Sequence, residues 1–367
     1  MKFDALIKLF RGKPIGVDLG TRTIKGIQLK RKNSYVYVEK FFFHDLSKTS
    51  DRFPDESNVA ETLKANVELT ELKKSWVACS LRDEDVLSMN FNLPAMKKNE
   101  MDQAVAHEIS EHLNLSPDKL SFDYSVVTQT GTSAADESPI GPSEVEIKAY
   151  CVNREIVQSR LKILKEAQLK PASMESDMLA IRAMLEFNGY LDPKKSFAVF
   201  DLGESHTTSA LIAKNELVFT KSSRTACGSV NKALREKLGM SYLQGEDTKI
   251  HYDFNVGAEP SAMDAKVIDE TYLDLFREIK DAMDFFSEKA GEGQRVDQLL
   301  LVGGGSQIKN IERVFEMFFR IPAVVVNPFR NIEIYKSGAK AQENEQDIGT
   351  LGPYMATAVG LALTGIE

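Results

Sequence analysis

The residues best suited to chemistry in this chain belong to two copies of one short motif, Asp-Leu-Gly. Asp18 and Gly20 belong to the first copy, and Asp201 and Gly203 belong to the second. A glycine at the end of a buried strand lets the backbone approach a phosphate closely, so that successive N–H groups point at its oxygens. Phosphate repels the aspartate, but the aspartate can hold a hydrated Mg²⁺ that contacts the phosphate. The two copies therefore predict a phosphate site with Asp18 and Asp201 as metal ligands.

Hydroxyl and ammonium donors follow both motifs. Thr21, Thr23 and Lys25 come after the first copy, and Thr207 comes after the second. Two facing turns of this kind would bracket a β,γ-phosphate pair and its metal, which is the charge arrangement that phosphoryl transfer requires. A single Asp-Leu-Gly would be better interpreted as a tight turn with a capping aspartate. Because the motif occurs twice, we prefer the interpretation as a phosphate site.

A glycine triplet, Gly303, Gly304 and Gly305, follows the apolar segment 299–302. It predicts a bare stretch of backbone on which an adenine or a ribose can lie flat. The triplet is not a dinucleotide fingerprint, because the third glycine of Gly-x-Gly-x-x-Gly is missing. The sequence also contains no P-loop.

Catalytic groups are harder to identify. Glu204 and His206 lie in the second turn and are the nearby candidates for activating a nucleophile. The interpretation of both as solvent-facing turn residues is the better one, so we expect ATP turnover to be slow at most.

The elements that must position these residues repeat along the chain. Segment 15–38 is expected to form strand, Asp-Leu-Gly turn, strand, turn and strand, and segment 196–220 has the same order. This recurrence indicates an internal duplication of a domain-sized unit. The glycine triplet then follows a third apolar strand and should precede a helix capped by Ser306.

The sequence between the two copies is longer than one copy needs. The segment from about 83 to 169 is expected to form a small inserted subdomain of strands and helices, interrupted by a Gly/Ser/Pro-rich loop at 128–144. We therefore predict a first lobe of residues 1–82 with 170–192 and 350–367, an inserted subdomain of 83–169, and a second lobe of 193–349.

The composition of the chain argues against several classes of protein. The chain has 367 residues, 43% of them hydrophobic, and a formal net charge of −8, which weighs against nucleic acid as the main ligand. Its 3 cysteines are far apart and fit reduced, buried thiols rather than a disulfide framework. No stretch approaches the roughly 20 apolar residues of a membrane span. Residues 1–13 are predicted to form a short basic amphipathic helix that rests on a membrane, on a partner or on its own domain.

Several segments resemble those of a known family. VDLGTRTIK and DLGESHT resemble the two phosphate motifs of the actin-like ATPases, LLLVGGGSQIKNI resembles their adenosine motif, and ATAVGLAL resembles their second connecting helix. Within this superfamily, FTKSSRTACGSVNKAL, VVNPFRNI and the inserted segment are similar to the PilM family of cytoplasmic type IV pilus assembly proteins, which is related to FtsA. The resemblance covers nearly the whole chain.

The resemblance implies a duplicated actin-like (RNase H-like) α/β fold with ATP and Mg²⁺ in the cleft between two lobes. It also implies that Glu246 and Lys249 flank the ribose or adenine, above the glycine triplet. This chain has Gly245 where relatives have alanine, and Cys227-Gly228 where they have a glycine pair. These departures affect the nucleoside contacts rather than the phosphate contacts.

The implied function is a scaffold at the cytoplasmic face of the inner membrane. Its groove, between the inserted subdomain and the first lobe, would accept the N-terminal peptide of a PilN-like membrane protein when nucleotide is bound. Two alternatives stay open: an FtsA-like, membrane-associated protein that forms filaments, and an active small-molecule kinase or ATPase. Association of the chain with itself is compatible with each of these.

Overall fold

The computed structural model describes residues 14–48, 56–127, 144–254, 262–289, 295–334 and 348–364. The predicted amphipathic helix at 1–13 lies outside the described residues, and so does the expected loop at 128–144 except for its last residue. Within the described part, no helix has an apolar stretch long enough to cross a lipid bilayer.

The first sheet has six strands in the order β14-β3-β2-β1-β4-β8. They are β1 (Ile15–Leu19), β2 (Thr23–Lys32), β3 (Tyr35–Asp45), β4 (Trp76–Leu81), β8 (Lys170–Ser176) and β14 (Ile332–Glu333). The strands β1, β2 and β3 form an antiparallel meander, and β4 runs parallel to β1. Every residue of β1 is buried, as expected for an apolar central strand with both faces covered.

The second sheet has five strands in the order β11-β10-β9-β12-β13. They are β9 (Ser196–Leu202), β10 (Thr207–Ala213), β11 (Glu216–Ser223), β12 (Gln298–Val302) and β13 (Ala323–Val325). This order matches β3-β2-β1-β4-β8 of the first sheet strand for strand, with the same antiparallel meander followed by parallel strands. The predicted duplication is therefore present in the topology.

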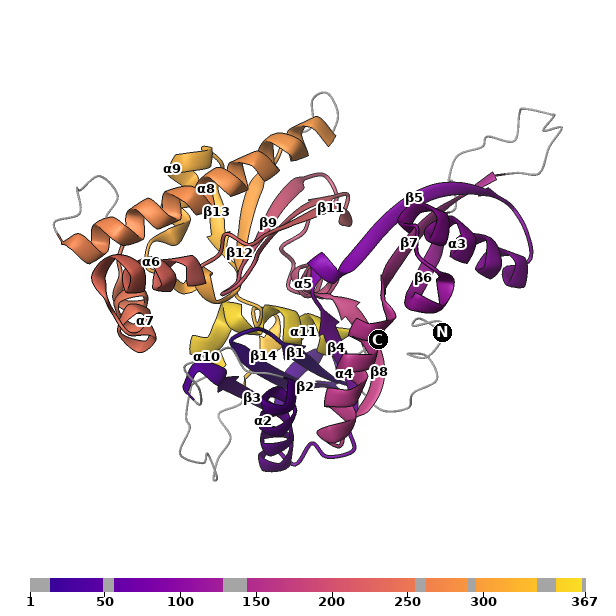
Figure 1. Cartoon of the computed structure of the whole chain (residues 1–367), viewed down its shortest axis with the longest axis horizontal. Helices are drawn as coiled ribbons and strands as arrows, with labels where there is room; N and C mark the ends of the chain where they lie inside the picture. The colour runs from indigo at the N-terminus through magenta and orange to yellow at the C-terminus, as the bar shows by residue number, and fades with distance from the viewer. Residues whose placement is uncertain are drawn as a thin grey trace.

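Two short helices lie between the sheets, α5 (Asp177–Phe187) and α11 (Ala356–Leu363) (Figure 1). One apolar core joins them to both sheets and includes Ile27, Ile181, Val199 and Val359. All residues of α11 are buried, which its small and apolar sequence predicts. This helix follows α10 (Ile348–Leu351) and the 3-10 helix η5 (Gly352–Met355).

The outer face of each sheet carries its own helices. Helices α2 (Glu56–Leu69) and α4 (Arg154–Glu166) pack on the first sheet, and we call this unit the first lobe. The helices of the second lobe are α6 (Gly228–Leu238), α7 (Tyr242–His251), α8 (Met263–Lys289) and α9 (Ile311–Phe319). Helices α6, α8 and α9 pack on the second sheet, and α7 packs against α6.

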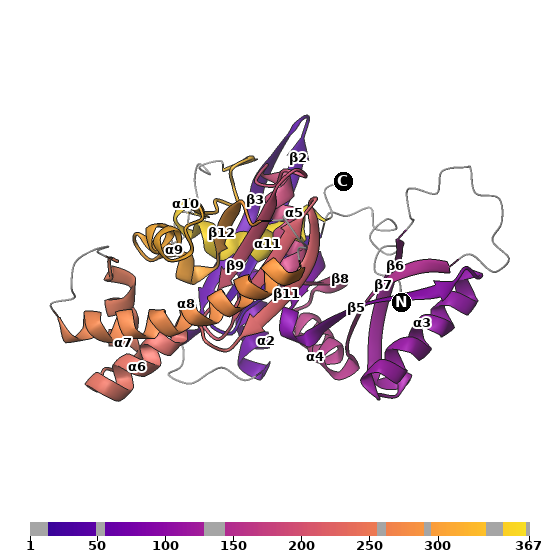
Figure 2. The same ribbon diagram turned by 90° about the horizontal axis from the view of Figure 1, so that it is seen from above.

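The inserted subdomain is a third sheet, in the order β5-β7-β6, with one helix packed on it. Its elements are β5 (Val86–Pro94), α3 (Lys98–Leu113), β6 (Leu120–Val127) and β7 (Glu144–Asn153). It projects from the first lobe beside α4, as Figures 1 and 2 show. The 3-10 helix η2 (Asp83–Asp85) connects β4 to β5 and forms its stem.

Three elements differ from the sequence-based expectation. Helix α4 shares the core of the first lobe rather than that of the inserted subdomain. Strand β14 pairs with β3 in the first sheet, although residues 193–349 were expected in the second lobe. The glycine triplet itself enters the 3-10 helix η4 (Gly304–Gln307), and Ser306 lies inside this short helix rather than at the cap of a following helix. The Ser306 hydroxyl instead donates to the Gly303 carbonyl at 2.8 Å, which closes a tight turn.

Candidate functional site

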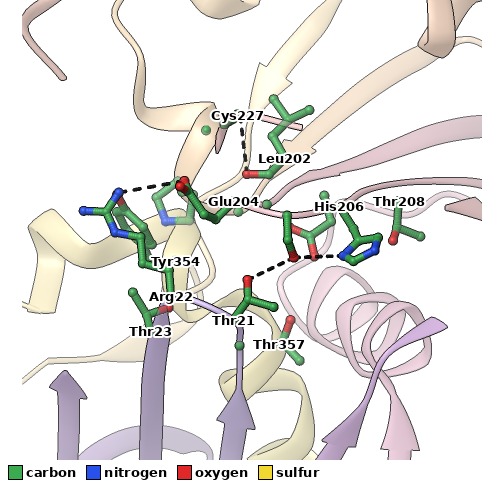
Figure 3. A pocket seen from close by; sticks show the side chains of 18 of the residues that line it. Thr21, Arg22, Thr23, Leu202, Glu204, His206, Thr208, Cys227, Tyr354 and Thr357 are labelled. Atoms are coloured by element: carbon green, nitrogen blue, oxygen red, sulfur yellow. Dashed lines mark hydrogen bonds and ion pairs between the residues drawn. The ribbon is translucent and has the colours of Figure 1, made fainter. Parts of the chain in front are cut away.

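A cavity of about 280 Å³ lies between the two lobes, where both Asp-Leu-Gly turns end. Figure 3 shows side chains of both turns converging on it from opposite sides. Its walls include nearly all residues predicted from the sequence: Asp18, Gly20, Thr21, Thr23, Lys25, Asp201, Gly203, Glu204, His206, Glu246, Lys249, Gly303, Gly304 and Gly305. The structure therefore brings together residues from distant parts of the chain.

The two turns have the same hydrogen bond. The Gly20 N–H donates to the Thr23 carbonyl and the Gly203 N–H donates to the His206 carbonyl, both at 3.1 Å. A Cβ at Gly203 would lie 2.6 Å from the His206 carbonyl oxygen, so this position requires glycine. The duplication thus extends to the conformation of the turns.

Thr207 does not face the cavity, contrary to its predicted role as a hydroxyl donor. It begins β10, and side chains of neighbouring strand residues point to opposite faces of the sheet. Thr208 therefore lines the cavity instead, with its hydroxyl 3.0 Å from that of Ser222. The Thr207 hydroxyl is buried and has no hydrogen-bond partner among the described residues.

Lys25 and Asp18 form a buried ion pair on the floor of the cavity. They face each other in the β1–β2 register, and their Nζ and Oδ2 atoms are 2.6 Å apart. The Ser80 hydroxyl donates to the other carboxylate oxygen of Asp18 at 3.3 Å. Burial lowers the pKa of Lys25, but the charge of Asp18 and its hydrogen bond to the ammonium group, together with the charges of Asp201 and Asp177, outweigh burial, so the net shift is upward. Lys25 is therefore a fixed cation in the cleft.

Three further carboxyls lie near this pair. Burial and the charge of Asp18 raise the pKa of Asp201 to about 6, against the attraction of Lys25. Burial and the charges of Asp18, Asp83 and Asp201 raise the pKa of Asp177 well above its usual range. The buried Oδ1 of Asp177 accepts no hydrogen bond from the described residues. A cation bound near these carboxyls would stabilise their ionised forms. Among the described residues, however, no three His, Cys, Asp or Glu side chains are close enough together to bind a metal ion directly.

Hydrogen bonds and ion pairs cross the cleft at three points. The Ser205 hydroxyl donates to that of Thr21 at 3.0 Å. A guanidinium nitrogen of Arg22, in the first turn, lies 2.6 Å from a Glu246 carboxylate oxygen. At the third point, the His206 Nε2 atom is 2.9 Å from a Glu84 carboxylate oxygen. The structure is thus a closed form in which the two turns touch.

Glu246 and Lys249 lie on α7 at the cleft and are buried. Their side chains pair at 2.8 Å, and Lys249 lies 3.4 Å from Glu204. Asn231 donates to Glu246 at 2.7 Å. Burial raises the pKa of Glu246, but Lys249 and Arg22 outweigh it and hold the net value low. The predicted nucleoside-flanking pair is therefore part of a charge network that extends to the first lobe.

The glycine triplet makes close contacts with the chain itself. A Cβ at Gly304 would lie 2.2 Å from the Tyr354 ring, and one at Gly305 would lie 2.1 Å from the Cys227 sulfur. Tyr354 also lines the cavity beside the triplet (Figure 3). One face of this backbone is consequently covered by protein side chains, so only its other side is left for a ligand.

A second cavity, of about 880 Å³, lies between the inserted subdomain and the first lobe. We call it the groove; its walls come from α3, β6, α4 and β8. It contains apolar side chains such as Phe122, Val157 and Met174 beside charged ones such as Lys98 and Asp123. Among the described strands, β6 pairs only with β7 and β8 only with β4, so each has one open edge.

Sequence reasoning missed Arg22, Ser205 and Asp177. Arg22 and Ser205 lie inside the two turns, and their position between the predicted phosphate residues was an available signal. Asp177 follows β8, and only the tertiary structure brings it to the cleft.

Comparisons with known proteins bear on fold and family. A family model described as type IV pilus assembly protein PilM matches residues 16–366. A chain of a solved PilM-PilN type IV pilus biogenesis complex is 18% identical, with a TM-score of 0.77 over 98% of this chain and 100% of that chain. MreB 5 of Spiroplasma citri bound to AMPPNP is 12% identical, with a TM-score of 0.50 over 96% and 95% of the two chains.

A further solved structure, Ta0583, an archaeal actin homolog in complex with ADP, is 13% identical, with a TM-score of 0.50 over 95% and 97% of the two chains. Together these similarities confirm the predicted duplicated actin-like fold.

Proposed function

The chain belongs to the type IV pilus assembly protein PilM family, and from this premise we propose that it binds magnesium-ATP in its cleft and a peptide in its groove. The peptide is the cytoplasmic N-terminus of a PilN-like protein of the inner membrane. The chain would then act as a scaffold at the cytoplasmic face of that membrane, and the bound nucleotide would set its affinity for the peptide.

The nucleotide part of the proposal is supported by the paired turns. Backbone N–H groups of both turns, the Thr21 and Thr23 hydroxyls and the Lys25 ammonium are donors that suit a polyphosphate. Mg²⁺ in such sites keeps several waters and uses one or two carboxylates together with phosphate oxygens. Asp18 and Asp201 would supply those carboxylates, and the metal would neutralise charge on the phosphates. The solved actin-like relatives named above carry AMPPNP and ADP.

The single observation that carries the peptide part is the groove with two open sheet edges. An extended peptide can add to β6 or β8 through main-chain hydrogen bonds while its side chains enter the groove. The apolar walls would bind alternate side chains of that peptide, and Lys98, Asp102 and Asp123 would set its polar contacts. The PilM-PilN complex is a structure with this fold.

A titration of the purified protein with a fluorescent PilN-like N-terminal peptide tests the proposal, with and without magnesium-ATP. Gln158 is exposed and lines the groove, so Gln158→Trp should fill the groove and weaken binding by about tenfold, or about 1.4 kcal/mol. Gln103→Trp makes the same change at an exposed position outside the groove and should bind like the wild type.

Absence of peptide binding in the presence of ATP would overturn the partner assignment. Equal affinity with and without nucleotide would overturn the nucleotide dependence alone. Equilibrium dialysis with ATP tests the cleft separately, because it needs no peptide.

A further inference from the structure

Three side chains in the cleft form a row of nucleophile, base and carboxylate. The Ser205 hydroxyl oxygen is 2.8 Å from His206 Nδ1. The His206 Nε2 atom is 2.9 Å from a carboxylate oxygen of Glu84. All three side chains line the cavity between the lobes. Activated serines share this arrangement, in which a base takes the hydroxyl proton and a third group orients the base.

Ser205 lies where a terminal phosphate must enter. Its hydroxyl donates to Thr21 of the opposite turn at 3.0 Å, and this contact joins the two phosphate turns (Figure 3). A polyphosphate held by both turns has to separate these hydroxyls and lie beside them. Thr21 also carries a hydroxyl group, but of these two hydroxyls it is that of Ser205 that lies within hydrogen-bond distance of an imidazole.

The base is held at both ring nitrogens. Because Glu84 lies at Nε2, its negative charge stabilises the imidazolium that forms when Nδ1 takes a proton. Glu204 precedes Ser205 but has other partners: Tyr242 donates to it at 2.9 Å and Lys249 lies 3.4 Å away. Of the two catalytic candidates in the second turn, the structure therefore favours His206.

We propose that Ser205 accepts the terminal phosphoryl group of a nucleoside triphosphate bound in the cleft. A bond forms between the Ser205 oxygen and the γ-phosphorus, and the bond from this phosphorus to the β,γ-bridging oxygen breaks. The hydroxyl proton moves to His206 Nδ1, the nucleoside diphosphate leaves, and phosphoserine remains. The inference rests on the proposed nucleotide binding.

The reaction limits itself to one event per molecule. Phosphoserine carries a charge of about −1.5 to −2 near pH 7, and this charge would occupy the place of a terminal phosphate. A second triphosphate would then meet a negative group between the two turns, so the modified protein favours the diphosphate. A phosphorylated Ser205 would thus mark a molecule that has bound and cleaved a nucleoside triphosphate.

The test incubates the full chain with magnesium-ATP labelled at the γ-phosphorus and locates the label by peptide mass spectrometry. Acid-stable label on Ser205 is expected, and ATP labelled at the α-phosphorus should leave none. Ser205→Ala should abolish labelling, whereas Ser88→Ala, at an exposed serine of β5, should leave it unchanged. His206→Gln should slow labelling by about a hundredfold and remove the pH dependence that an ionising imidazole gives to the rate.

Equilibrium dialysis of the same variants with ATP separates this inference from the proposed function. Retention of ATP without label on Ser205 overturns the inference and leaves the nucleotide site standing. Failure of the wild type to retain ATP overturns both. Label that persists at another residue in Ser205→Ala, or labelling of His206→Gln at the wild-type rate, assigns the chemistry elsewhere and overturns the inference.

Discussion

Four aspartates, Asp18, Asp83, Asp177 and Asp201, lie close together in the cleft beside the Lys25 ammonium group, so the charge of each carboxyl affects the ionisation of its neighbours. Lys25 neutralises Asp18, while burial raises the pKa of the other three carboxyls. Ionising them without a cation nearby costs free energy, and a bound cation would offset that cost. The site is therefore arranged so that metal and negative charge stabilise each other.

This arrangement predicts an inverted pH dependence of stability. A carboxyl with a higher pKa in the folded chain binds more protons there than in the unfolded chain, so stability falls as pH rises through the window between the two values. For Asp201 this window runs from 3.8 to about 6. Asp45 and Glu246 have lowered pKa values and act in the opposite sense, but only below their ordinary values of 3.8 and 4.5.

Urea unfolding without metal or nucleotide, from about pH 4.5 to about pH 7, measures the effect. Asp201→Asn should remove about 2 kcal/mol of the fall in unfolding free energy across this range, because one unit of pKa shift corresponds to about 1.36 kcal/mol. The comparison of slopes holds even if the substitution changes overall stability. Parallel slopes in the two proteins would contradict the prediction, and Mg²⁺ with ATP should flatten the wild-type slope.

At the scale of single residues, the sequence predicts those site residues that belong to a short local motif. Asp18, Gly20, Asp201 and Gly203 could be predicted because strand, turn and residue type lie together in the chain. Thr207 could not be placed, because a shift of one residue at the start of a strand reverses the side-chain direction. Arg22 has no partner near it in sequence, since Glu246 reaches it only through packing of the two lobes.

At the scale of elements, helix α11 packs very closely against its neighbours. It packs against α5 and β1 with almost no space between backbones: a Cβ at Gly360 would lie 1.9 Å from the Ala180 carbonyl oxygen, and one at Gly16 would lie 2.0 Å from the Ala358 carbonyl oxygen. Both obstacles are backbone atoms, so a side-chain rotation cannot relieve them. The connecting helices thus hold the two sheets at a fixed separation.

Gly360→Ala should accordingly destabilise the protein by about 1–3 kcal/mol, the usual cost of overpacking a core. Gly352→Ala is the matched control, because no atom lies within 4 Å of a Cβ placed there, and its effect should stay within about 0.5 kcal/mol. Chemical unfolding of both variants checks this. Equal stability of the two variants would mean that α5 and α11 can move apart far enough to accommodate the added methyl group.

Most elements could be predicted because apolar periodicity and turn residues mark them. The predicted repeat at 196–220 corresponds to β9, β10 and β11, which together run from Ser196 to Ser223. The 3-10 helix η4 was missed, since Gly303 adopts a φ of +81° and turns the chain before a helix can start. Strand β14 is two residues long and has too little pattern to be recognised before its partner is known.

At the scale of the whole molecule, the two lobes and the inserted subdomain are tied together around the cleft. Glu84, on the stem of the subdomain, pairs with His206 of the second lobe, and Lys148 of β7 donates to the Leu217 carbonyl at 3.0 Å. The inserted subdomain, which carries part of the groove wall, is therefore in direct contact with the second lobe, and through Glu84 with its phosphate turn. A ligand that changes the separation of the lobes also acts on these contacts, which is the route by which nucleotide could set the shape of the groove.

The Arg22 contacts should determine how long a nucleotide stays in the cleft. Arg22 lies 2.9 Å from Asp45 of its own lobe and 2.6 Å from Glu246 of the other, and both of these carboxylates keep another partner if it is removed. A hydrogen bond to a charged group contributes about 1.5–3 kcal/mol, so Arg22→Gln should speed release of a fluorescent ATP analogue by about tenfold or more. Arg277→Gln, at an exposed ion pair on α8, should leave release unchanged.

A second measurement shows whether faster release comes from opening of the cleft. Without nucleotide, X-ray scattering should give a larger radius of gyration for Arg22→Gln than for the wild type, because the lobes are no longer held by this pair. If release accelerates while the radius stays the same, Arg22 acts as a direct ligand of the nucleotide and not as a clasp between the lobes. If neither quantity changes, the contact between Arg22 and Glu246 does not stabilise the closed cleft, and other contacts between the lobes, such as Thr21–Ser205 and His206–Glu84, keep it closed.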